Sequence, residues 1–138
     1  MIVDERIVAY IHSLAQDDCE PLMKIEQDAR ENHVPIVKKE TKELLKVLVL
    51  MKRPKNILEV GTAVGFSSLY MNQYQPEDGR ITTIERNAGR IAKAKENIKK
   101  FEKEGVIELL EGEAMEILKE LQEQYDMIFV DASKGQYI

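Results

Sequence analysis

The stretch NILEVGTAVGFSS, residues 56–68, decides the fold. Its apolar run carries Glu59 one residue before the end and is followed by Gly61 and Gly65. An apolar run that stops at glycines predicts a buried strand and a tight turn. Glycine at such a turn lets a ligand approach the backbone, and the helix that follows presents free N–H groups. The stretch therefore predicts a ligand site at the end of a strand.

Short apolar runs alternate with helical patterns from this point onward. The helical patterns are residues 66–74, a segment through Ile91, Ala94, Ile98 and Phe101, and residues 114–124. The predicted strands are 56–60, 80–84, 106–111 and 126–130. Strands that alternate with helices in this way are typical of an α/β protein with a parallel sheet and right-handed crossovers.

The first 53 residues have helical periodicity instead. Apolar residues recur at helix spacing in three successive segments: Ile7, Val8, Ile11 and Leu14; then Leu22, Ile25 and Ala29; then Leu44, Leu45, Val47, Leu48 and Met51. We therefore expect a single domain, with a helical cap over 1–53 and the sheet with its helices over 54–138.

The composition excludes several classes of protein. The net charge is −5 and the isoelectric point is near 5.2, which argues against a broad electrostatic surface for nucleic acid. A single cysteine, Cys19, excludes an internal disulfide framework, as expected for a cytoplasmic protein. The longest apolar run, residues 47–51, is too short to span a membrane, so we expect no membrane partner.

Glu85 marks the end of the second predicted strand, 85 − 61 = 24 residues after Gly61. An acidic residue at this spacing can accept hydrogen bonds from ribose hydroxyls. The fingerprint of a nicotinamide dinucleotide requires glycine at three places, which here hold Gly61, Ala63 and Phe66. Two of the three glycines are missing, so the pattern disfavours that ligand. A plain tight turn with a solvated Glu85 is the alternative interpretation.

Four motifs, in order, resemble those of a known family: ILEVGTAVGFSSLYM (57–71), ITTIERN (81–87), LLEGEAMEIL (109–118) and YDMIFVDASKGQY (125–137). They are similar to the class I S-adenosylmethionine-dependent O-methyltransferases of the catechol and caffeoyl-coenzyme A type. The segment NHVPIVKKETKELL, 32–45, resembles the helical cap of bacterial members, which include enzymes that methylate 5-hydroxyuridine in tRNA. The resemblance implies a Rossmann-like methyltransferase fold with strand order 3-2-1-4 in the part present here.

The resemblance also implies a binding site for S-adenosylmethionine. In the family pattern, residues of the first strand, of its glycine turn and of the start of the next helix line the methionine and ribose portion of the cofactor, and Glu85 holds the ribose. A segment after the third strand flanks the adenine, and Asp131 closes the methionine end. Members often have Asp where this chain has Glu113. The implied cofactor-binding residues are Glu59, Gly61, Ala63, Gly65, Ser67, Glu85, Gly112, Glu113, Ala114 and Asp131.

Members of this type use a divalent cation, usually Mg²⁺, to lower the pKa of the acceptor hydroxyl. The resemblance assigns Asp131 as the first metal ligand and Lys134 as the catalytic base that takes the acceptor's proton. Taken without the family match, Asp131 also suits a helix N-cap, and Lys134 suits a solvated loop.

The family has seven strands, whereas four are predicted in this chain. The other metal ligands of the family, an Asp-Asn pair, come at the end of the strand that follows these four. We therefore expect a truncated form that retains the cofactor-binding half, with self-association through the edge strand 126–130. The expected acceptor is a hydroxyl of a small molecule or of hydroxyuridine in tRNA. Two alternatives stay open: a non-catalytic binding or assembly module, and a fragment of an NAD-binding oxidoreductase.

Overall fold

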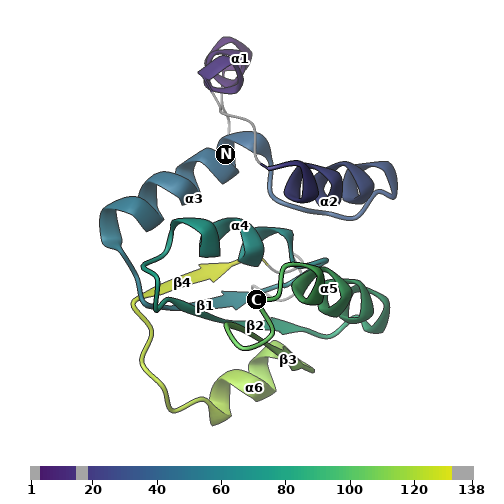
Figure 1. Cartoon of the computed structure of the whole chain (residues 1–138), viewed down its shortest axis with the longest axis vertical. Coiled ribbons are helices and arrows are strands. Elements are labelled where there is room, and N and C mark those ends of the chain that lie inside the picture. The colour runs from purple at the N-terminus through teal and green to yellow at the C-terminus, as the bar shows by residue number, and fades with distance from the viewer. Residues whose placement is uncertain (1–3, 15–18, 132–138) are drawn as a thin grey trace.

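The computed structural model describes residues 4–14 and 19–131 of the 138-residue chain. Within these ranges the elements follow the predicted order (Figure 1). Three helices come first: α1 (Glu5–Leu14), α2 (Glu20–Glu31) and α3 (Lys39–Lys52). The alternating part comprises β1 (Asn56–Val60), α4 (Phe66–Tyr74), β2 (Arg80–Glu85), α5 (Ala88–Lys100), β3 (Ile107–Glu111), α6 (Ala114–Glu120) and β4 (Met127–Val130).

The sheet has the strand order β3-β2-β1-β4, and each neighbouring pair is parallel. This confirms the predicted order 3-2-1-4 and the Rossmann-like class. Strand bounds differ from the sequence prediction by one residue at β2, β3 and β4. The last helix is shorter than predicted, because Leu121 already has an extended backbone at the helix C-cap.

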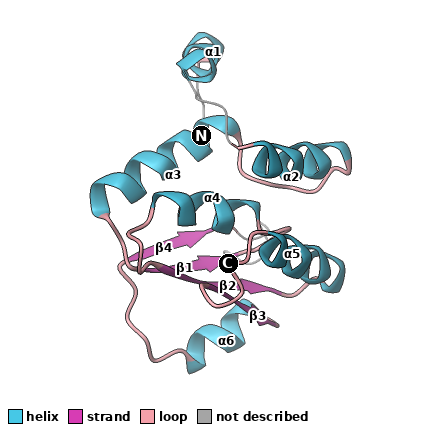
Figure 2. Cartoon of the chain, in the orientation of Figure 1, coloured by secondary structure: helices cyan, strands magenta, loops and turns pink. Residues whose placement is uncertain are grey.

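Helices cover both faces of the sheet (Figure 2). α4 and α5 lie on one face, with α2 and α3 stacked beyond them, and α6 lies on the other. The larger apolar core fills the first side and joins the cap to the sheet through Leu22, Val49, Phe66, Tyr70 and Met71. A smaller cluster around Leu58, Val60 and Ile84 packs beneath α6.

β1 is buried on both faces, because its residues alternate between these two cores. Ile57 packs in the larger cluster, and Leu58 and Val60 pack in the smaller one. A strand covered on both sides has an almost continuous apolar sequence, as this strand has from Ile57 to Val60 apart from Glu59. Glu59 lies between Leu58 and Val60 in the chain and therefore faces the α4 side.

Within the described ranges, no helix combines the length and the apolar content needed to cross a bilayer.

Candidate functional site

The carboxyl ends of the strands meet at a cleft of about 420 Å³. Ligand clefts in proteins are typically of roughly 300–1,000 Å³, and in open α/β sheets they lie at this edge. Backbone hydrogen bonds extend the sheet past the strand ends. Gly61 N donates to Ile84 O (2.9 Å), Gly112 N to Glu85 O (2.9 Å) and Asp131 N to Val60 O (2.8 Å). The strand ends are therefore held in fixed register around the cleft.

The turn after β1 needs glycine or small residues for its backbone conformation. Gly61 and Gly65 have φ of 101° and 87°, and Ala63 between them has φ of 49°. These values lie in the left-handed region that side chains larger than glycine rarely adopt. Gly65 N also donates to Thr62 O (2.9 Å), which closes the turn before α4 begins.

Glu85 is the main side chain of the cleft and is almost fully buried. Its Oε1 accepts from Ala63 N (2.9 Å), and its Oε2 accepts from Arg86 N and Asn87 N (both 3.0 Å). A carboxylate has about four acceptor positions, so one position on Oε1 stays available to a ligand beside these three bonds. The carboxylate thus joins the β1 turn to the β2 end and faces the cleft.

The structure brings six of the residues implied by the resemblance to the walls of this cleft: Gly61, Ala63, Glu85, Gly112, Ala114 and Asp131. Partial burial raises the pKa of the Asp131 carboxyl above its usual value. Lys134, the implied base, lies outside the described residues.

Glu59 lies beneath the cleft and does not line it. Its side chain is completely buried, and its carboxylate accepts hydrogen bonds from Ser67 Oγ, from Ser68 Oγ (2.5 Å) and from Thr83 Oγ1 (2.7 Å). Thr83 Oγ1 also lies 2.7 Å from Thr62 Oγ1. Glu59 and Ser67 therefore connect β1, β2, the glycine turn and α4 under the site.

Glu113 lies at the rim of the site. It precedes α6 and forms an exposed ion pair with Arg86, with Nη1 and Oε1 3.1 Å apart. This pair links the segments that follow β2 and β3, and of its two residues only Arg86 lines the cleft.

The cleft has walls that the sequence reasoning did not identify. Arg86, Asn87 and Arg90 follow Glu85, and their closeness to a strand end was a usable signal. Pro35 and Ile36 come from the cap, and no local pattern marks them as part of a site.

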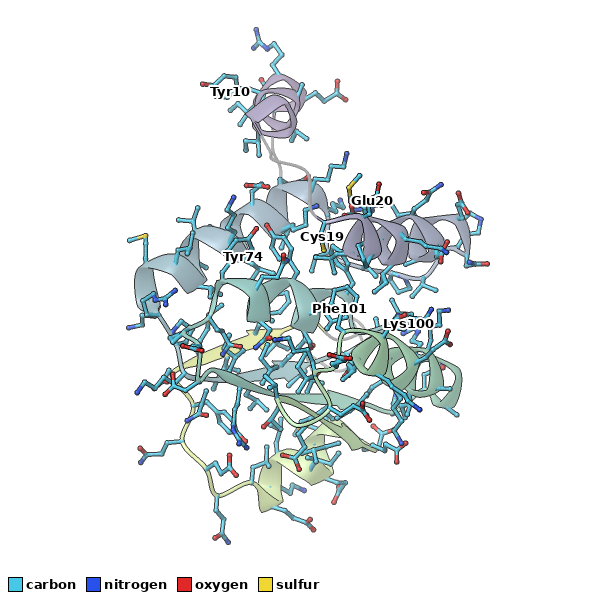
Figure 3. All side chains as sticks on the ribbon, in the orientation of Figure 1. Tyr10, Cys19, Glu20, Tyr74, Lys100 and Phe101 are labelled. Carbon is cyan, nitrogen blue, oxygen red and sulfur yellow. The ribbon has the colours of Figure 1, made fainter. Side chains whose placement is uncertain are left out.

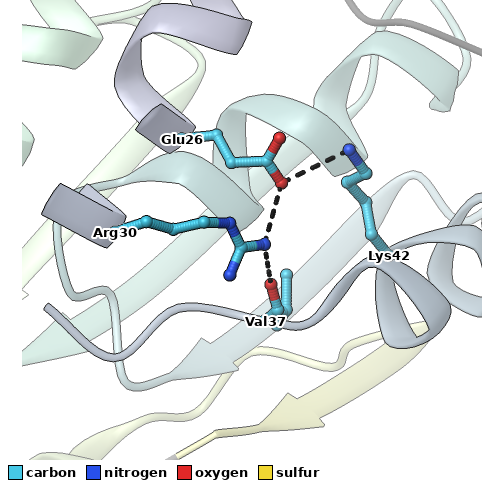
Figure 4. A network of polar contacts seen from close by, with 4 residues as sticks. All are labelled: Glu26, Arg30, Val37 and Lys42. Carbon is cyan, nitrogen blue, oxygen red and sulfur yellow. Dashed lines mark hydrogen bonds and ion pairs between the residues drawn. The ribbon is translucent and has the colours of Figure 1, made fainter. Parts of the chain in front are cut away.

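A polar cluster holds the cap segment that carries Pro35 and Ile36 (Figure 4). Glu26 Oε2 lies 3.1 Å from Arg30 Nη2 and 3.4 Å from the buried Lys42 Nζ. Arg30 Nη2 also donates to Val37 O (3.3 Å). The Lys42 ammonium lies 5.8 Å from the ring centre of Phe66 and 5.6 Å from that of Tyr70, both in α4. The cluster therefore fixes α2, α3 and this wall of the cleft relative to α4.

Comparison with known proteins identifies the family. The family model described as O-methyltransferase matches residues 12–138. The chain belongs to the O-methyltransferase family. This O-methyltransferase chain is similar to the catechol O-methyltransferase of Niastella koreensis, with 30% identity over 139 residues that cover 96% of the chain and 63% of that protein.

Two solved methyltransferase structures are also similar. The structure of the methyltransferase PaMTH1 of Podospora anserina bound to S-adenosylhomocysteine has a TM-score of 0.88 and 26% identity, and the match covers 99% of this chain and 63% of PaMTH1. The structure of the O-methyltransferase TomG of Streptomyces achromogenes with S-adenosylmethionine has a TM-score of 0.82 and 32% identity, over 99% of this chain and 66% of TomG. The chain thus spans less than two thirds of the length of these relatives.

Burial of Glu59 makes the stability of this O-methyltransferase chain dependent on pH. Burial raises the pKa of Glu59 from 4.5 to about 7, against the opposing effect of the three hydroxyl donors. Between these values the unfolded chain loses the proton that the folded chain keeps, so stability decreases as the pH rises. The Glu59→Gln variant has no titratable group at this position and serves as the reference. Relative to it, the free energy of unfolding of the wild-type chain should fall by about 3 kcal/mol between pH 4.5 and pH 7. Urea denaturation of both proteins measures this, and a difference that stays constant with pH contradicts it.

Proposed function

We propose that the cleft binds S-adenosylmethionine and that the chain is the cofactor-binding part of an enzyme that methylates a hydroxyl group. The observation that carries the proposal is the Glu85 carboxylate, which is fixed by three backbone N–H groups and faces a cleft at the carboxyl ends of the strands.

The chemistry of the cleft suits a sulfonium nucleoside. The available acceptor position of Glu85 matches a ribose hydroxyl, and Gly61 and Gly112 leave their backbone without a Cβ beside the ligand. Arg86 and Arg90 lie at the same cleft and can face a carboxylate. Bound S-adenosylmethionine would supply an electrophilic methyl group, and the task of the chain is to hold that group in line with the acceptor oxygen.

The ligands of the similar proteins support this assignment. PaMTH1 was solved with S-adenosylhomocysteine and TomG with S-adenosylmethionine. Both were matched over nearly the whole of this chain.

The proposed roles of the site residues follow from their positions. Gly61, Ala63, Glu85, Gly112, Ala114 and Asp131 are proposed to contact the cofactor. Glu59, Gly65 and Ser67 are proposed to act from beneath by fixing the turn, and Glu113 by holding Arg86. Lys134 is proposed as the base on the resemblance alone.

We propose Asp131 as one ligand of a divalent cation such as Mg²⁺ and assign no other ligand. No group of three or more metal-ligating side chains occurs in the described part of the chain. The described residues therefore do not form a complete metal site. The acceptor is proposed to be a hydroxyl of a small molecule or of hydroxyuridine in tRNA.

Calorimetry with three ligands tests the proposal. We expect S-adenosylhomocysteine and S-adenosylmethionine to bind the chain with one site each, and NAD not to bind. Binding of NAD alone would support the oxidoreductase alternative. Absence of binding by all three would support a non-catalytic module and would overturn the proposal.

We also propose that two copies associate through the β4 edge. Among the described strands β4 pairs with β1 only, and Ile128 on it is 60% exposed. Unpaired apolar edges tend to pair with other chains, and a lysine at such an edge opposes this. Ile128→Lys should therefore raise the dimer dissociation constant at least about tenfold, by roughly the 1.4 kcal/mol that corresponds to a factor of ten. Analytical ultracentrifugation measures this, and a monomeric wild-type chain at high micromolar concentration contradicts it.

A further inference from the structure

We propose that a second cleft, between α2 and α5, binds a small organic anion with a flat apolar body. The cleft has a volume of about 730 Å³, within the range typical of ligand sites. It lies beside the cofactor cleft, with which it shares Asn87 and Arg90, and its other lining residues are different. Figure 3 shows Glu20 at the start of α2 and, across from it, Lys100 and Phe101 at the end of α5.

The inner wall of this α2–α5 cleft is apolar. Ile25 and Ala29 of α2 face Phe101 at the end of α5, and Val34 and Val64 complete the wall. Ile25, Ala29 and Val64 are buried within the protein, so their surfaces are fixed by packing. Val34 and Phe101 are only partly buried, and a flat hydrocarbon or aromatic group would remove their remaining exposed surface from water, at roughly 25 cal/mol per Å² of apolar area.

The polar groups of the α2–α5 cleft select the charge of the ligand. Four basic side chains (Lys24, Arg90, Lys93, Lys100) and two acidic ones (Glu20, Asp28) line it. Lys93 and Lys100 both pair with Glu96. Among the residues that the structure describes, Lys24 and Arg90 have no ion-pair partner, so they are the cations available to a carboxylate or a phosphate.

A buried amide adds a polar contact inside the cleft. Asn97 is 1% exposed and lines the α2–α5 cleft. Its Nδ2 donates to Val64 O (2.8 Å), and within the described ranges its Oδ1 has no donor. A hydroxyl or N–H group on the apolar body of the ligand can donate to this oxygen.

The two clefts share Asn87 and Arg90 in their walls. A ligand in the α2–α5 cleft that attracts Arg90 therefore changes a wall of the cofactor cleft. Because such coupling is reciprocal, each ligand should change the affinity of the other by the same factor.

A pair of fluorescent probes tests the site: the aromatic sulfonate 8-anilinonaphthalene-1-sulfonate and its uncharged analogue N-phenyl-1-naphthylamine. We expect the sulfonate to bind the wild-type chain at one site. Lys24→Glu should weaken the sulfonate about tenfold and change the uncharged probe less than twofold. Lys24 is exposed, so this substitution spares the core.

A control variant identifies binding elsewhere. The outer face of α3 carries exposed Leu44, Val47, Leu48 and Met51, and such a patch can also attract the probes. Leu48→Asp should leave both affinities unchanged. Loss of the sulfonate in Leu48→Asp, or equal sulfonate binding by wild type and Lys24→Glu, would overturn the proposal. Neither result bears on the cofactor cleft, because S-adenosylhomocysteine binding is measured separately in each variant.

Discussion

Glu85→Ala is expected to lower the affinity for S-adenosylhomocysteine by at least about 100-fold. The substitution removes the acceptor for a ligand hydroxyl. It also leaves the N–H groups of Ala63, Arg86 and Asn87 without their carboxylate partner, so the β1 turn keeps only its backbone hydrogen bonds to the β2 end. Hydrogen bonds to a charged group are worth about 1.5–3 kcal/mol each, and every 1.4 kcal/mol changes the dissociation constant tenfold. Isothermal titration calorimetry measures the effect.

Glu111→Ala is the matched control for Glu85→Ala. Glu111 ends β3 in register with Glu85, but it is exposed and pairs with Lys95 at 2.9 Å. Exposed ion pairs contribute little, so we expect the affinity of this variant to stay within about twofold of wild type. Glu85→Gln keeps one oxygen acceptor and should lose less affinity than Glu85→Ala. Wild-type affinity in a folded Glu85→Ala variant would show that the carboxylate does not hold the ligand.

Lys42→Met is expected to destabilise the chain by about 2 kcal/mol. Removing one partner of a buried ion pair costs about 3–5 kcal/mol, and Arg30 stays beside Glu26 and reduces this cost. The variant also loses the contact between the ammonium and the rings of Phe66 and Tyr70. Urea denaturation at pH 7 measures the change.

The same substitution should weaken S-adenosylhomocysteine by about fivefold. Glu26 and Arg30 hold Val37, and the segment before it carries Pro35 and Ile36 into the cofactor cleft. Lys46→Met, one turn further along α3, is the control. Lys46 lies 5.4 Å from the ring centre of Tyr74 and has no part in this cluster. We expect it to change stability by less than about 1 kcal/mol and the affinity not at all. Equal losses in both variants would assign the effect to general weakening of the cap.

The sequence predicted the sheet well because its signals are local. Apolar runs that stop at Gly61, Glu85 and Gly112 marked the strand ends, and parallel strands bring such ends to the same edge of a sheet. Their convergence at one cleft therefore followed from topology. The exact helix end after Ala114 did not, because α6 has no residue typical of a C-cap, and it ends where Leu121 becomes extended.

The depth of each side chain could not be predicted in the same way. β1 is buried on both faces, so its apolar run does not show which way Glu59 points. Only the packing of α4 on the sheet places Ser67 and Ser68 at its carboxylate. The Glu26–Lys42 pair joins residues 16 positions apart on two helices, and the angle between these helices is set by tertiary packing rather than by local sequence.

A crystal structure of the chain with S-adenosylhomocysteine tests whether Glu85 holds the ribose at the carboxyl ends of the strands. We expect density for the nucleoside in the cleft at the strand ends, with a ribose hydroxyl oxygen about 2.5–3.0 Å from Glu85 Oε1. The same crystals should show the glycine turn after β1 against the ligand. Density for the ligand at another place, or an empty cleft at a ligand concentration that saturates binding in solution, would contradict this expectation.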